Sequence, residues 1–146
     1  MKQYLILLLF CIIGLGSSSA LAQERNENVE AAKVAYITDK VELTADQAQK
    51  FWPVYNEYET KRRDLMRNYR SGYRRNLEEM SEQEARARIE EMFDTKEKEL
   101  ALEKEYAARY QRIISTKQLI KLYRAERDFT KLLLKKLDAS RAASNR

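Results

Sequence analysis

The chain has no histidine and very little cysteine, proline or glycine. Among its 146 residues are one cysteine, one proline and three glycines. Tight turns between strands depend on glycine and proline, so their scarcity argues against a fold of many strands and hairpins. Glutamate, lysine, arginine, alanine and leucine are plentiful instead, and all five favour helices. The composition therefore predicts an all-α fold.

The same absences restrict the chemistry available to the protein. Without histidine, nucleophilic catalysis would need a serine–lysine pair or two carboxylates, and the sequence has no glycine-rich loop or nucleophile elbow to present them. Transition-metal sites also rely on histidine or cysteine. Met66, Met80 and Met92 are scattered along the chain, and we interpret them as packing side chains. We expect no enzyme activity, no cofactor and no metal.

The first 22 residues have the pattern of an export signal. Lys2 is followed by a nearly continuous apolar run over residues 4–15 and by the small-x-small site Ala20-Leu21-Ala22. The run is shorter than the roughly 20 residues that span a bilayer, and no second candidate follows it. We expect a cleaved signal peptide over 1–22, which contains Cys11, one helical domain over 23–138 and a disordered tail over 139–146. No transmembrane segment is expected after processing.

The charge of the expected mature chain is mildly basic. Without Lys2, 27 of the 28 basic residues remain against 23 acidic ones, a net charge of +4. The two signs are well mixed along the sequence, unlike a basic arm that binds nucleic acid. We therefore expect no nucleic-acid partner.

Three short motifs mark the starts of helices. In each, a hydroxyl residue is followed three positions later by glutamine or glutamate, which is a capping box. The first two boxes follow an aliphatic residue that can staple the first turn, and the third is Ser81 with Glu84. We expect the residues of the first two motifs to be structural helix caps: Leu43, Thr44, Gln47, Ile114, Ser115 and Gln118.

The helical periodicity predicts four helices, over residues 28–40, 44–73, 81–113 and 115–138. The two long central helices are joined by a short turn over 74–80 and must form an antiparallel hairpin. Pro53 lies inside the first of them and should bend it. The expected inward-facing residues of the second and last helices are Phe51, Tyr55, Tyr58, Leu65 and Tyr69, and Leu119, Leu122, Phe129, Leu133 and Leu137.

Charged residues interrupt the apolar faces of this hairpin. Arg62 falls within the stripe of the second helix, and Lys96 and Glu103 within that of the third. One explanation is an ion pair between the helices, since Arg62 comes level with about Asp94. The other, which we favour, is a thin, cradle-like layer whose inner face stays wet, because a closed core would not bury these groups unpaired. A second subunit would complete this layer. The residues expected to be half exposed are Phe51, Tyr55, Leu100 and Phe129.

The paired motifs, the long helices and the export signal together resemble the Spy/CpxP group of periplasmic proteins, which is named for its LTxxQ motif. The resemblance covers residues 29–137. The first motif matches in full, and the second has Ile114 for leucine and Ser115 for threonine. Residues 43–58, with Phe51-Trp52-Pro53, also resemble members from Bacteroidetes that are labelled sensors of extracytoplasmic-function (ECF) sigma factors.

The resemblance implies a periplasmic, cradle-shaped antiparallel homodimer of kinked hairpins without enzyme activity. It implies an envelope-stress protein that binds unfolded or acidic proteins as an ATP-independent chaperone. A second function stays open, that of a sensor or regulatory partner of an ECF sigma factor or a two-component system. The metal-sensing branch of the group uses histidine, which this chain lacks.

The candidate binding surface is a basic stripe on the second helix. Arg63, Arg67, Arg70 and Arg74 are spaced i, i+4, i+7 and i+11, with Tyr69 and Tyr73 at the border. The stripe lies about a third of a turn from the aromatic one. It could be a solvated face balanced by acids of the third helix, or a surface for acidic or partly unfolded protein, because arginine forms bidentate ion pairs and stacks on aromatic rings. Anionic lipid headgroups are a third alternative.

Overall fold

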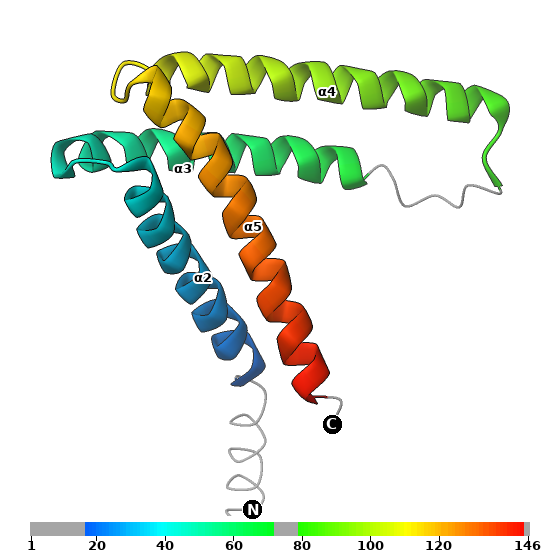
Figure 1. Cartoon of the computed structure of the whole chain (residues 1–146). Helices are drawn as coiled ribbons and strands as arrows, with labels where there is room; N and C mark the ends of the chain where they lie inside the picture. The colour runs from blue at the N-terminus through cyan, green and yellow to red at the C-terminus, as the bar shows by residue number, and fades with distance from the viewer. Residues whose placement is uncertain (1–16, 72–78, 145–146) are drawn as a thin grey trace, which may run out of the picture. The chain divides into compact units, whose positions relative to one another are not determined.

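The computed structural model describes residues 17–71 and 79–144, which form helices joined by short connections (Figure 1). Its helices are α2 (Ser17–Val41), α3 (Ala45–Ser71), α4 (Glu82–Tyr110) and α5 (Thr116–Ser144). These ranges contain no strand. The all-α fold and the four helices expected from the sequence are confirmed.

The helix boundaries differ from the expected ones mainly at the outer ends. Helix α2 begins at Ser17, so the expected cleavage site after Ala22 lies within it in the full-length chain. Helix α5 continues past Asp138 to Ser144, through a segment that we expected to be a disordered tail. That segment contains alanine and arginine but no glycine or proline, so nothing in it ends the helix. Residues 74–78 of the expected turn lie outside the described residues, as do Gly72 and Tyr73 before it.

The chain divides into two compact units, which we describe separately. The first unit consists of the described residues of Met1–Lys40 and Ala125–Arg146. Within it, α2 and the later part of α5 run in opposite directions (Figure 1), and the rings of Tyr36 and Phe129 lie 5.6 Å apart. Ile37 and Ala125 are buried. The expected inward-facing residues Phe129, Leu133 and Leu137 are half-buried.

The second unit, Val41–Arg124, contains the hairpin of α3 and α4, which lie side by side and antiparallel (Figure 1). Its core is aromatic. The ring of Phe51 lies 5.1 Å from that of Tyr110, and the ring of Tyr58 lies 5.3 Å from that of Tyr106. Phe51 is 0% and Tyr55 2% exposed. The expectation that these two are half exposed is therefore wrong, because α4 covers them with Tyr110.

The hairpin contains the interhelical ion pair that we considered but did not favour. Arg62 Nε lies 2.9 Å from Glu99 Oε1, whereas Asp94, the partner estimated from the turn, pairs with Lys98 of its own helix at 2.7 Å. The arginine and glutamate side chains stay 48% and 29% exposed. Toward the turn, the only buried residue of α4 is Thr95. Both explanations of the charged residues, the interhelical ion pair and the thin layer, therefore apply in part. The inner face of this layer is partly ion-paired and partly open to solvent.

Candidate functional site

Both repeated motifs form closed capping boxes. At the start of α3, Gln47 N donates to Thr44 Oγ1 at 3.2 Å, and Thr44 N donates to Gln47 Oε1 at 3.1 Å. At the start of α5, Gln118 N donates to Ser115 Oγ at 3.2 Å, and Ser115 N donates to Gln118 Oε1 at 3.0 Å. Each box satisfies two backbone N–H groups that a helix start leaves without a partner.

The two glutamine side chains also bond to each other. Gln47 Nε2 donates to Gln118 Oε1 at 3.2 Å, and Gln118 Nε2 donates to Gln47 Oε1 at 3.0 Å. Each Nε2 donates in addition to the carbonyl two residues before the other cap, that of Ile113 at 3.3 Å and that of Glu42 at 3.3 Å. We call this arrangement of Gln47 and Gln118 the glutamine clasp. It ties the start of α3 to the start of α5.

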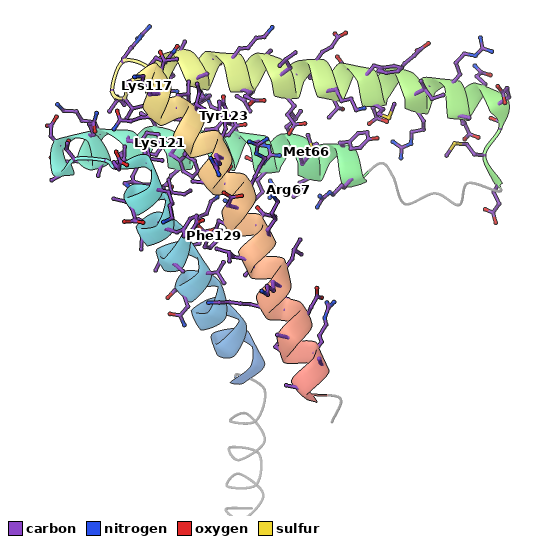
Figure 2. All side chains as sticks on the ribbon, viewed as in Figure 1. Met66, Arg67, Lys117, Lys121, Tyr123 and Phe129 are labelled. Atoms are coloured by element: carbon purple, nitrogen blue, oxygen red, sulfur yellow. The ribbon has the colours of Figure 1, made fainter. Side chains whose placement is uncertain are left out.

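The backbone at Glu42, next to the glutamine clasp, adopts a conformation that places its carbonyl against the clasp. Glu42, just after the end of α2, has a φ of 58°, a left-handed conformation that is uncommon outside glycine. Its carbonyl accepts from Gln118, and its carboxylate lies 2.7 Å from Lys121 Nζ. Lys121 lies on the second turn of α5 (Figure 2). Both the backbone carbonyl and the side-chain carboxylate of Glu42 therefore contact α5. Sequence reasoning found the caps and missed this link between them.

A different cluster joins the middle of α3 to α4. The carboxylate of Glu57 accepts from Arg109 Nη1 at 3.0 Å and Nη2 at 2.7 Å, and also from the hydroxyl of Tyr106. Lys61 Nζ lies 3.1 Å from the same carboxylate. These bonds, that from Arg109 above all, hold the pKa of Glu57 well below its usual range. Arg109 also lies over the ring of Tyr106, 4.5 Å from its centre. Sequence reasoning missed this cluster because Glu57 and Arg109 lie on different helices, 52 residues apart.

The described part of the arginine stripe is exposed on α3. Arg63, Arg67 and Arg70 are exposed, and Tyr69 at their border is half-buried. Arg67, labelled in Figure 2 next to Met66, has a 71% exposed side chain and pairs with Asp64 of its own helix at 2.7 Å. Arg74 and Tyr73, the remaining members of the predicted surface, lie outside the described residues.

The described arginines of the stripe, Arg63, Arg67 and Arg70, make no ion pair with α4. Arg62 makes an ion pair with Glu99 of α4, and Lys61 pairs with Glu57 of its own helix, which in turn pairs with Arg109 of α4. At about 100° per residue, Arg63 lies roughly opposite Lys61 on the helix. Within the part of the chain that the structure describes, Arg63 and Arg70 make no ion pair. The acids of α4 therefore do not pair with Arg63 or Arg70, whose guanidinium groups stay open to a ligand.

Comparison with known proteins assigns no function to the arginine stripe. Comparison with models of protein families, with curated proteins and with solved structures finds no match. Among the described residues, no three histidine, cysteine or carboxylate side chains are grouped so as to hold a metal. None of the four helices is long and apolar enough to cross a membrane, as far as their described residues go. The resemblance to the LTxxQ proteins stays a prediction.

Proposed function

We propose that this protein is a periplasmic, non-enzymatic chaperone of the Spy/CpxP kind, which holds unfolded or acidic clients without ATP. The observation that carries the proposal is the exposure of Arg63, Arg67 and Arg70 on α3, with Arg63 and Arg70 outside any ion pair of the described chain. Guanidinium groups that the fold does not use are available to the carboxylates of a client.

The chemistry of this surface suits capture that is easily reversed. Each arginine offers a bidentate contact to carboxylates and a flat face for aromatic rings, and Tyr69 adds contact area with little conformational entropy to lose. The interactions of such exposed charges are weak one by one and are screened by salt. A client held by several of them can leave without an energy source, as an ATP-independent holdase requires.

The alternative, a regulatory partner of an ECF sigma factor or two-component system, gains no support from the residues that suggested it. That likeness included Phe51-Trp52-Pro53, and the fold already explains Phe51, which is buried against Tyr110. The burial of Phe51 in the core accounts for this residue without a signalling partner. The two functions differ in client range, since a chaperone suppresses the aggregation of unrelated proteins and a dedicated regulator does not.

The test is to change Arg63, Arg67, Arg70 and Arg74 to glutamine and to measure how well the variant suppresses the aggregation of an unrelated denaturing protein. Glutamine keeps good helix propensity, so the fold should survive. We expect the parent protein to suppress aggregation less well as salt rises, since the Debye length falls below about 10 Å above 0.1 M. The variant should suppress aggregation poorly at every salt concentration.

A matched control removes the same charge elsewhere. Arg127, Lys135, Lys136 and Arg141 are exposed residues of α5, and changing all four to glutamine alters the net charge equally. This control should retain the parental activity and salt dependence. If both quadruple variants lose activity, net charge rather than the stripe governs client capture. If both match the parent, the stripe is only a solvated face.

A further inference from the structure

Helix α5 carries the whole net positive charge of the chain. It contains eight basic and three acidic residues, a net charge of +5. The whole chain has 28 basic and 23 acidic residues, also a net charge of +5, so the residues outside α5 are balanced. A charge that gathers on one helix, while the rest of the chain is neutral, favours an anionic partner for that helix.

The exposed side of the later part of α5 combines several of these cations with a large apolar side chain. Ala125 is buried and Phe129 contacts Tyr36, so these two mark the packed side of the helix. At about 100° per residue, the opposite side holds six exposed residues, which are Arg127, Lys131, Leu134, Lys135, Asp138 and Arg141. We call these six residues the α5 outer face.

The fold makes little use of the cations of the α5 outer face. Within residues 17–71 and 79–144, Arg127, Lys135 and Arg141 make no side-chain hydrogen bond or ion pair. Lys131 lies 3.7 Å from an aspartate of its own helix, and its side chain is 77% exposed. Leu134 lies in line with Arg127 and Arg141, to within about 20°, and is 57% exposed. Packing within the first unit therefore leaves most of this leucine uncovered among cations.

We propose that the α5 outer face binds the surface of an anionic lipid bilayer, with the helix parallel to the plane of the membrane. The cations lie among the phosphates of the headgroups, and Leu134 enters the boundary between headgroups and acyl chains. Lys131 and Lys135 suit this place, because the apolar stem of a lysine can lie along acyl chains while its ammonium group stays among the phosphates.

Two features favour a bilayer over an acidic protein or a nucleic acid. The α5 outer face presents a leucine among cations, and the interface of a bilayer offers anionic charge and an apolar layer side by side. In addition, the exposed residues of 125–143 include no aromatic side chain on which protein rings or nucleobases could stack. The arginine stripe of α3 differs in this respect, since Tyr69 lies at its border.

Asp138 is the one acid of the α5 outer face and gives the proposal a test by gain of binding. Within the described residues it makes no ion pair. Its carboxylate repels lipid phosphates, so Asp138→Asn should tighten binding to anionic vesicles by up to about fivefold. Binding to neutral vesicles should not change, which distinguishes this gain from apolar surface exposed by a damaged fold.

The test measures the affinity of the full chain for two kinds of vesicle by co-sedimentation. One kind is phosphatidylcholine alone, and the other is phosphatidylcholine and phosphatidylglycerol in equal parts. The readout is the ratio of the two affinities, to which the apolar run over residues 4–15 contributes equally. We expect the parent to prefer the anionic vesicles by about tenfold or more and to lose this preference as salt rises.

Two variants should weaken binding to the anionic vesicles for different reasons. The α5 variant, with Arg127, Lys135, Lys136 and Arg141 changed to glutamine, removes three of the four cations of the α5 outer face and should lose most of the preference. Leu134→Gln keeps every charge and a good helix propensity, and should weaken binding to anionic vesicles about fivefold through the lost apolar contact.

The matched control is the arginine-stripe variant, which removes the same charge from α3 and should keep the parental preference. The α5 variant should in turn still suppress aggregation. This inference does not rest on the proposed function, because the two surfaces lie on different helices and each variant tests one of them.

Four results would overturn the proposal. They are a parent without preference for anionic vesicles, an α5 variant that keeps the preference, an arginine-stripe variant that loses as much of it as the α5 variant, and a Leu134→Gln variant that binds like the parent. If the parent has no vesicle preference and the α5 variant alone loses client capture, the α5 outer face binds acidic proteins instead.

Discussion

At the scale of single residues, the glutamine clasp explains why the repeated motif contains glutamine. A capping box needs only an acceptor at its third helical position, and Glu84 serves that purpose at the start of α4. Gln47 and Gln118 need acceptor and donor in one side chain. Each Oε1 accepts from its own cap and from the other glutamine, while each Nε2 donates across the clasp. A carboxylate cannot do both.

We therefore predict that Gln47→Glu is strongly destabilising, although it preserves the capping box. It removes both Nε2 bonds and sets a carboxylate against the oxygens of Gln118 and Ile113. The expected loss is about 1–3 kcal/mol of unfolding free energy, the cost of part-buried polar groups left unsatisfied. Thr44→Ala, which removes one cap bond, should cost about 1 kcal/mol. Urea unfolding followed by circular dichroism measures both.

The matched control for this prediction is Glu84→Gln in the third box. That box closes within the first turn of α4, where Ser81 N donates to Glu84 Oε2 at 2.9 Å and Glu84 N donates to Ser81 Oγ at 3.3 Å. Glutamine can replace the glutamate there, so the change should stay within about 0.5 kcal/mol. Equal effects of Gln47→Glu and Glu84→Gln would show that the clasp contributes nothing beyond capping.

At the scale of helices, local sequence signals predict the elements well and their partners poorly. The capping hydroxyls Thr44, Ser81 and Ser115 mark where α3, α4 and α5 begin, because a cap acts within one turn of its own helix. The partner of a side chain on the neighbouring helix depends on the turn between them and on the rotation of each helix. For this reason Arg62 pairs with Glu99 rather than Asp94, and the ion pair of Arg109 with Glu57 was not predicted.

The Glu57 cluster should make the hairpin sensitive to acid. The pKa of Glu57 is lower in the folded chain than in the unfolded chain, so its stabilising effect is present above the unfolded pKa of about 4.3 and is lost as the pH falls toward the folded value. We predict that Glu57→Gln lowers the melting temperature at neutral pH and has a smaller effect near pH 3, where the parent has itself lost part of this contribution.

Glu105 provides the comparison for this prediction. It is an exposed carboxylate of α4, one turn before Arg109, and it makes no ion pair within the described chain. Glu105→Gln should change neither the melting temperature at neutral pH nor its pH dependence. Thermal melts of the parent and of both variants at several pH values test whether Glu57 makes the stability depend on pH. If Glu57→Gln and Glu105→Gln give the same pH profile, the Glu57 cluster does not couple α3 to α4.

At the scale of the whole molecule, composition and periodicity were enough to predict an all-α chain of four helices, but not how deeply each face is buried. Phe51 and Tyr55 were expected to be half exposed and are buried, because Tyr110 of α4 covers them. The arginine stripe could be predicted because it depends on spacing along one helix. The clasp and the Glu57 cluster could not, since each joins residues that are far apart in the sequence.

The most direct test of the proposed function is a binding measurement with one client in two states. A permanently unfolded acidic protein, such as reduced and carboxymethylated α-lactalbumin, is labelled and titrated with the parent protein at low and high salt, alongside its folded form. We predict tighter binding to the unfolded form than to the folded form, with an affinity that falls as salt rises. Absence of binding to the unfolded form, equal binding to both forms, or binding that ignores salt would contradict the account.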